Sequence, residues 1–156
     1  MTLLDLLELD EIPDEYHYLF TDEYLGDRHI FRVWAHNPAV LEATLEYLNT
    51  LYEQLTPRWK ELVILTVAWS RGARYEWHQH VDIARDLGVS TDELRAIGGG
   101  DFSPFDDAEF VLVQYARAVA EGTVTDQIHA ALCEQFSSGD VVAIGLLVDF
   151  YVGLCN

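Results

Sequence analysis

The apolar residues of this 156-residue chain recur mainly at intervals of three and four, which is the spacing of a helix face. Between residues 37 and 55 the apolar positions that share one such face are Val40, Leu41, Leu45, Leu48, Leu51 and Tyr52. No segment of the sequence shows the sustained period-two alternation that is typical of strands. The pattern therefore predicts an all-α protein. We expect an N-terminal helical extension over residues 1–36 and one helical domain over residues 37–156.

Residues that start and stop helices divide this pattern into elements. Thr56 before Pro57 is a typical helix start, and Gly72 and Gly88 are typical residues at helix ends. The three glycines and Pro104 between residues 98 and 107 predict a loop. The predicted helices cover residues 37–55, 56–72, 74–87, 106–122, 125–136 and 138–156, with a further helix start at 90–94.

The stretch 62–69, LVILTVAW, is apolar on nearly every side of its helix. A helix without a polar face is typical of the centre of a domain, so we expect this one to be buried. At this length the apolar run is far too short to span a bilayer.

The net charge of the chain excludes some classes of binding partner. The chain holds 27 Asp and Glu against 9 Lys and Arg, a formal net charge of −18. Such a surface repels nucleic acid and anionic membranes, so we expect neither as a partner. The acidic residues are dispersed among apolar ones, which argues for a folded chain. Adaptation to a salty cytoplasm explains this composition, and an ordinary acidic protein is the simpler alternative.

The cysteines and the N-terminus indicate the compartment. Cys133 and Cys155 are the two cysteines, and no CxxC pair or disulfide framework is present. The N-terminal sequence MTLLDLLELDEIPDEY lacks the basic start of a signal peptide. We therefore expect a cytoplasmic protein.

The segment YEWHQH contains the most suggestive polar residues. On a helix over 74–87, His80 lies at the edge of the apolar face, and Glu76 lies four residues before it on the same surface. His78 shares a face with Asp82 and Arg85 and should be exposed. Without further information, His80 is a core histidine or a proton-transfer group, and Glu76 is a helix-start acid or its partner. The spacing does not match HExxH, so we expect no metal.

Glu61 stands one residue before the apolar run, on the same helical row as Ile64, Leu65 and Ala68. It is a first-turn acid, or the ion-pair partner of Arg58 at i−3, or a desolvated carboxylate suited to proton transfer.

A longer stretch resembles a known family. LTPRWKELVILTVAWSRGARYEWHQHVDIARDLGVSTDELRAI, residues 55–97, is similar to the carboxymuconolactone decarboxylase/AhpD-like family. The resemblance implies the AhpD-like all-α fold, and it continues more loosely to residue 156. It also implies a homo-oligomer, a homotrimer or homohexamer, with sites near subunit interfaces.

One branch of this family consists of thiol hydroperoxidases, whose motif is a glutamate, a CxxC pair and a histidine. Carried over, the glutamate falls on Glu61 and the histidine on His80, whereas the two cysteine positions fall on Ala73 and Glu76. Peroxide reduction by that route needs an attacking and a resolving thiol. Thiol peroxidase activity is therefore disfavoured.

The decarboxylase branch carries an acid four residues before a histidine, which Glu76 and His80 resemble. That chemistry needs a group that stabilises negative charge and delivers a proton to carbon, which a histidine beside a carboxylate does without a cofactor. The resemblance implies His80 as acid or base, with Glu61 and Glu76 orienting it. The expected pocket-lining residues are Tyr75, Trp77, His78 and His36.

Three hypotheses follow from these residues. The first is a cofactor-free lyase acting on a small organic acid or lactone. The second is a hydroperoxidase that uses another route, and the third is a non-enzymatic oligomeric binding protein that keeps the fold.

Overall fold

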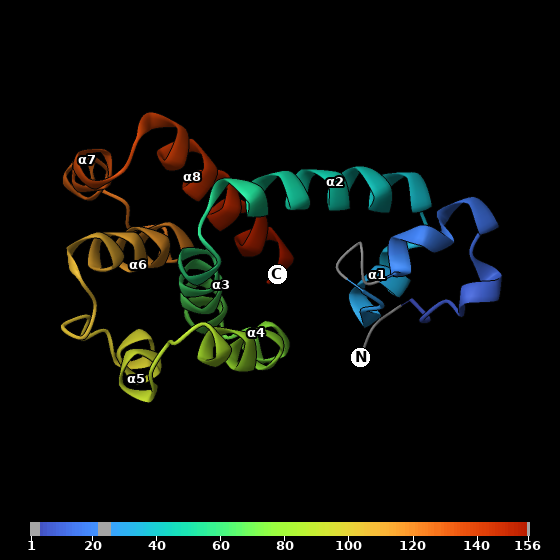
Figure 1. Cartoon of the computed structure of the whole chain (residues 1–156), viewed down its shortest axis with the longest axis horizontal. Helices are drawn as coiled ribbons and strands as arrows, with labels where there is room; N and C mark the ends of the chain where they lie inside the picture. The colour runs from blue at the N-terminus through green and yellow to red at the C-terminus, as the bar shows by residue number, and fades with distance from the viewer. Residues whose placement is uncertain (1–3, 22–25, 156) are drawn as a thin grey trace. The chain divides into compact units, whose positions relative to one another are not determined.

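The computed structural model describes residues 4–21 and 26–155. Every regular element in these residues is a helix, so the predicted all-α fold is confirmed. The chain divides into two compact units, residues 1–50 and 51–156. Helix α2, Pro38–Gln54, begins in the first unit and ends in the second (Figure 1). The predicted boundary after residue 36 stays a prediction.

The first unit is built from short helices. Two 3-10 helices, η1 Leu9–Glu11 and η2 Asp14–Phe20, precede α1, His29–Trp34, and the first part of α2. One cluster of buried apolar residues in this unit contains Ile12, Leu19, Phe31, Ala35, Leu41 and Leu45. The unit therefore has a small core of its own.

The second unit contains the remaining helices. They are α3 Pro57–Arg71, α4 Arg74–Asp86, α5 Thr91–Gly99, α6 Asp107–Glu121, α7 Asp126–Gln135 and α8 Ser138–Leu154. All of these elements lie close to their predicted positions.

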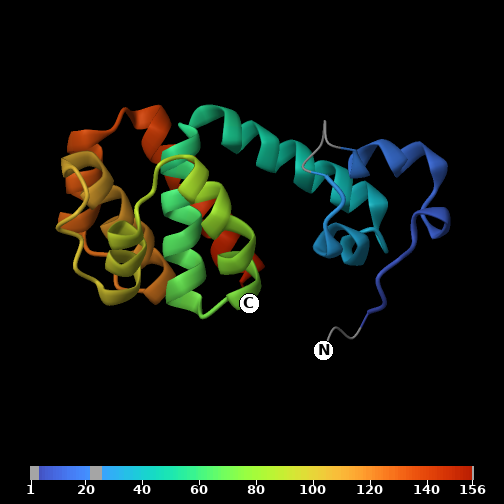
Figure 2. The same cartoon turned by 60° about the horizontal axis from the view of Figure 1, so that its bottom comes forward.

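Helix α3 is the centre of the second unit. It packs against α4, α5, α6 and α8, which surround it in Figures 1 and 2. Its residues 61–68 are all buried, as the apolar run predicts. Trp69 is the exception, because half of its surface stays exposed (49 %) where α3 reaches the edge of the unit. The expectation that the whole of 62–69 is buried is wrong at this last residue.

Local sequence explains where these helices end. The hydroxyl of Thr56 accepts a hydrogen bond from the Trp59 N–H, and Gly72 takes the left-handed conformation after α3 (φ 68°). The predicted loop at 98–107 is wrong at its start, because Gly98 and Gly99 belong to α5. Gly100 provides the left-handed end of that helix (φ 76°), so the third glycine of the run stops it.

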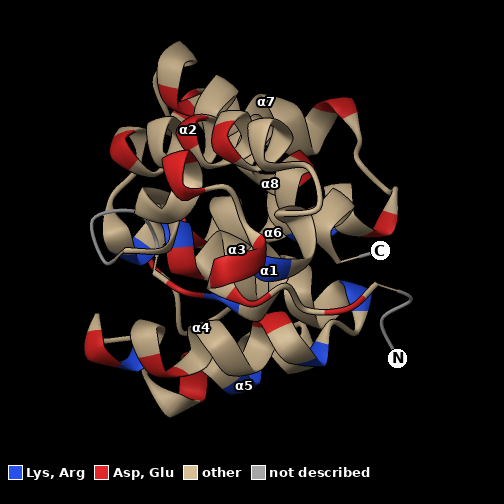
Figure 3. Cartoon of the chain, turned by 90° about the vertical axis from the view of Figure 1, so that its right-hand side faces the viewer, with Lys and Arg blue, Asp and Glu red and all other residues tan. Residues whose placement is uncertain are grey.

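Acidic residues are distributed over many helices, and basic residues are fewer (Figure 3). No helix in the described part of the chain has both the length and the apolar composition needed to cross a membrane.

Candidate acid–base site

Helices α3 and α4 are joined by two residues, Gly72 and Ala73, so they form a tight helical hairpin. This hairpin brings Glu61 of α3 against His80 of α4. The His80 Nδ1 lies 2.8 Å from Oε2 of Glu61, within hydrogen-bond distance. Glu61 is buried (3 % exposed) and His80 is half-buried, so solvent screens this pair poorly.

Glu76 lies on the other side of the same imidazole. Its Oε2 is 3.8 Å from the His80 Nε2, within ion-pair range but too long for a hydrogen bond. Burial raises the pKa of the Glu76 carboxyl, and the nearby His80 partly offsets this. Each ring nitrogen of His80 therefore faces a buried carboxylate, one from α3 and one from its own helix.

Two tyrosines complete the surroundings of His80, and no local pattern of the sequence predicts either of them as a site residue. The ring of Tyr151 on α8 meets the His80 ring edge to face, with centroids 5.7 Å apart. The Tyr151 hydroxyl is hydrogen-bonded to the Tyr52 hydroxyl, and burial raises the Tyr151 pKa well above its usual value. Tyr151 therefore stays a neutral phenol against the imidazole.

Cys155 also belongs to these surroundings, although it follows the last helix. Burial, followed by the negative charge of Glu76, raises the pKa of its thiol to about 11. Cys133 is exposed on α7, where its Sγ lies 3.7 Å from the His129 Nε2. Within the described residues, no disulfide joins these two cysteines.

The structure separates the remaining predicted site residues. His78 and Tyr75 are exposed on α4, and Trp77 packs edge to face on Trp69 with ring centroids 5.3 Å apart. His36 is in the first unit, where its Nε2 lies 3.0 Å from the carbonyl oxygen of Asp5. The described contacts thus join only Glu61, Glu76 and His80 of the predicted set.

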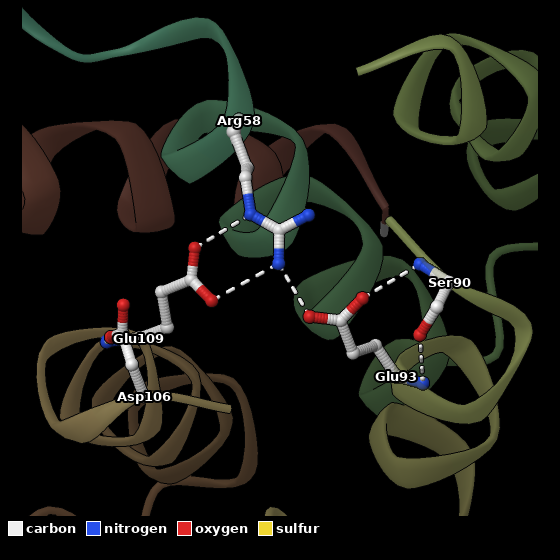
Figure 4. A network of polar contacts seen from close by, with 5 residues as sticks. All are labelled: Arg58, Ser90, Glu93, Asp106 and Glu109. Atoms are coloured by element: carbon white, nitrogen blue, oxygen red, sulfur yellow. Dashed lines mark hydrogen bonds and ion pairs between the residues drawn. The ribbon is translucent and has the colours of Figure 1, made fainter. Parts of the chain in front are cut away.

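Arg58 is not the partner of Glu61, so that alternative is wrong. Its guanidinium Nε donates to Glu109 at 2.7 Å, and a second nitrogen donates to both Glu109 and Glu93 (Figure 4). These contacts connect α3 to α5 and α6. The described side-chain partner of Glu61 is therefore His80.

Among residues 4–21 and 26–155, no group of three His, Cys, Asp or Glu side chains is arranged to hold a metal ion. The cluster of Glu61, Glu76 and His80 is suited to proton exchange. Because a buried Glu61 accepts from Nδ1–H, a neutral imidazole presents an unprotonated Nε2. The tautomer follows from this hydrogen bond. The fold and this site define an all-α protein with a buried carboxylate–histidine–carboxylate cluster.

Comparison with known proteins identifies the family. The sequence profile of the carboxymuconolactone decarboxylase family matches residues 38–121, which includes α3, α4 and α5 entirely. The chain belongs to the carboxymuconolactone decarboxylase family.

A solved structure supports the fold. The crystal structure of an uncharacterized peroxidase-related protein from Silicibacter sp. TM1040 superposes with a TM-score of 0.82 and 20 % sequence identity. The alignment covers 99 % of this chain and 86 % of that one. No curated protein matches the chain significantly. At this identity the likeness shows the shared AhpD-like fold.

Proposed function

We propose that this protein is a cofactor-free acid–base enzyme, a lyase that removes carboxylate from a small organic acid or lactone. The observation that carries the proposal is the position of His80 between Glu61 and Glu76, 2.8 Å and 3.8 Å from its two ring nitrogens. A histidine oriented by a buried carboxylate is a common general acid or base.

The proposed reaction uses only these side chains and the substrate. The carbon–carbon bond to the carboxylate breaks, carbon dioxide leaves, and the electron pair stays on the substrate as an enolate of its lactone or keto group. His80, protonated at Nε2, then delivers that proton to carbon and is reprotonated from water. Glu61 stabilises the cationic imidazolium that the cycle requires.

Glu76 has a different role in this proposal. It lies in the first turn of α4, and burial raises its pKa, so it holds a proton more readily than an exposed glutamate. The Glu76 carboxyl lies next to Nε2, where substrate charge develops in this proposal, and its readiness to take up a proton lessens the repulsion of a substrate anion. A permanently charged carboxylate there would instead repel the substrate anion.

The hydroperoxidase alternative has less support from this chain. The two family thiol positions hold Ala73 and Glu76. The thiol of Cys155 has its pKa raised to about 11, so little attacking thiolate is present near neutral pH. The peroxidase-related neighbour shares the fold at 20 % identity and is no guide to activity.

The decisive experiment compares His80→Gln with His78→Gln in high salt. Both variants remove an imidazole from α4, but His78 is exposed and lies outside the cluster. The substrates are γ-carboxymuconolactone and related lactone acids, followed by carbon dioxide release and product analysis. We expect His80→Gln to lower kcat by about 100-fold or more, the usual contribution of a general acid or base, and His78→Gln to change it little.

Other outcomes would contradict the proposal. Equal decarboxylation by both variants removes His80 from the chemistry. Hydroperoxide turnover by wild type that is lost when Cys155 is replaced by Ala would indicate the thiol route. A folded protein that is silent on all these substrates would favour the non-enzymatic binding hypothesis.

Assembly and location complete the proposal. We also propose that the protein is a homotrimer or homohexamer, as the family resemblance implies, and that it works in the cytoplasm. The excess of 27 acidic over 9 basic residues supports a working environment of high salt, where repulsion between subunits is screened.

A further inference from the structure

A groove separate from the His80 cluster lies where the end of α3 meets α4 and α5. Its volume is about 400 Å³, within the range of small-molecule sites. On α4 it is lined by Trp77, Val81 and Arg85, which occupy every fourth position. Glu76 and His80 form the adjoining row of the same helix, so the groove and the cluster use neighbouring faces of α4.

Two indole rings form the aromatic wall. Trp69 is half exposed, and it meets Trp77 at an angle of 62° with centroids 5.3 Å apart. Gly98 of α5 makes room for this arrangement, because a Cβ there would lie only 3.1 Å from the Trp69 ring. Leu94 adds an aliphatic side to the groove. Partly exposed indole rings beside a glycine are suited to packing against a planar group.

The charged side chains that line the groove are basic, whereas the protein as a whole is strongly acidic. Arg85 and Arg95 line it, and none of the eight described lining residues is acidic, in a chain with three times as many acidic as basic residues. Both α4 and α5 carry basic positions among acidic ones in Figure 3. An anionic ligand therefore meets two arginines and no lining carboxylate in this groove.

The two arginines are available to a ligand. Arg85 pairs with Asp82 at 2.9 Å and Arg95 with Asp92 at 3.0 Å, each along its own helix. Both aspartates are highly exposed (81 %), and exposed pairs of this kind contribute little free energy. The carboxylate of a ligand bound against the indole rings competes with these aspartates for the same guanidinium groups. It is less hydrated than the exposed aspartates, so its ion pair with an arginine is stronger.

We infer that this groove is a binding site for a small planar organic anion, of the aromatic carboxylate class. The ring of the ligand stacks on one of the two indoles and meets the other edge-on, and its carboxylate pairs with Arg85 and Arg95. Charge complementarity decides for an anion, and the volume of about 400 Å³ admits one aromatic ring with its substituents. The site is independent of the proposed lyase chemistry, because it includes none of Glu61, Glu76 and His80.

The test is isothermal titration calorimetry of the full chain at low salt with benzoate as the probe. Benzamide, of the same shape but neutral, and cyclohexanecarboxylate, an anion without a flat ring, are the matched ligands. The variants are Arg85→Gln and Arg95→Gln, with Arg74→Gln as the control, since Arg74 is an exposed arginine of α4 outside the groove. Circular dichroism checks that each variant is folded.

We expect benzoate to bind wild type more tightly than either matched ligand. Each groove variant should weaken benzoate roughly tenfold, the effect of losing one charge-assisted hydrogen bond, and Arg74→Gln by less than about twofold. His80→Gln should leave benzoate binding unchanged, whether or not decarboxylation is found. The groove result therefore does not depend on the proposed function.

Three results would overturn the inference. They are an absence of benzoate binding to wild type, equal weakening by Arg74→Gln, and equal binding of benzamide. Light scattering adds a fourth: a wild-type oligomer that dissociates in the Trp69→Ser variant would identify a second copy of the chain as the occupant.

Discussion

Three helices of the second unit carry a buried glutamate in the first turn, but these glutamates have different partners. Glu76 of α4, Glu93 of α5 and Glu109 of α6 each occupy the third helical position, and each is buried. Glu93 and Glu109 share the guanidinium of Arg58 (Figure 4), whereas Glu76 faces the imidazole of His80. The partner of each carboxylate is therefore either permanently charged or titratable.

This difference changes how firmly the carboxylates hold their charge. Burial acts to raise the pKa of Glu93, but hydrogen bonds from Ser90 and Arg58 outweigh it, so the pKa lies below its usual value. For Glu76, burial dominates and the pKa is raised. The first arrangement favours the ionised carboxylate and makes it part of a structural clamp, which we name the Arg58 clamp, and the second makes Glu76 easier to protonate than an exposed glutamate.

The origin of the difference is the residue before each helix. Ser90 caps α5, and its backbone N–H donates a hydrogen bond to the returning Glu93 carboxylate at 2.6 Å. Ala73 has no side chain to cap α4, and its N–H already donates to the Ala68 carbonyl in the Gly72 turn. Glu76 therefore has no N-cap partner to return to and stays beside His80.

The largest expected effect comes from removing the Arg58 clamp, which is the ion pairing of Arg58 with Glu93 and Glu109. Arg58→Met leaves the two buried carboxylates of Glu93 and Glu109 without a cation, so we expect the free energy of unfolding to fall by about 3 kcal/mol. Arg74→Met, at an exposed position, is the control and should change it by less than about 0.5 kcal/mol. Urea denaturation in constant salt measures both. A loss for Arg58→Met no larger than that of the control would contradict the clamp.

A pH series sharpens the contrast between Glu76 and Glu93. With a pKa raised from the usual 4.5, Glu76 contributes stability below that pH, and this contribution is lost as the pH rises through its folded-state pKa. Glu93, with a lowered pKa, contributes stability above 4.5, and this contribution is lost as the pH falls through its folded-state pKa. The two carboxylates should therefore have opposite effects near neutral pH.

The measurement compares Glu76→Gln and Glu93→Gln with wild type by urea denaturation from about pH 3 to about pH 8. Relative to wild type, we expect Glu76→Gln to gain stability as the pH rises above 4.5, and Glu93→Gln to lose stability as the pH rises from the acid end of the series up to 4.5. The slope with pH is the readout, because hydrogen bonds lost on substitution give a constant offset. Parallel slopes for the two variants would rule out the assigned directions.

The smallest predicted effect concerns the missing cap of α4. Ala73→Ser adds a hydroxyl that accepts from the Glu76 N–H, and we expect the free energy of unfolding to rise by about 0.5 kcal/mol. The gain is modest because the Ala73 backbone (ψ 85°) departs from the extended geometry that Ser90 has (ψ 162°). Thermal denaturation measures it, with Ser90→Ala as the reverse substitution on α5. Destabilisation by Ala73→Ser would show that this turn does not admit a cap.

Much of the fold follows from local sequence. Thr56 and Gly72 mark the ends of α3, and the predicted helices from residue 37 onward lie within a few residues of the observed ones. The glycine run at 98–100 misled the prediction, because glycine lowers helix propensity without preventing a helix. Leu94 and Ile97 on the buried face hold α5 in place as far as Gly99.

The site was only partly predictable, for reasons of chain distance. Glu76 and His80 are neighbours on one helix, so spacing finds them, and the family resemblance adds Glu61. Arg58 is 35 and 51 residues from the carboxylates it binds, and Tyr151 is far along the chain from His80. Such pairings depend on how the helices pack, which no local pattern of the sequence records.

The two-residue turn at Gly72 and Ala73 has a consequence for protein engineering. It leaves the N-terminus of α4 uncapped by any side chain, with the positive end of the helix dipole facing positions 73 and 76. These are the positions where the thiol branch of the family carries its cysteines, and a helix start favours a thiolate as it favours a carboxylate. The helix start after this turn therefore favours an anion at either position, and Ala73→Cys with Glu76→Cys would place there the cysteine pair that the family resemblance implies.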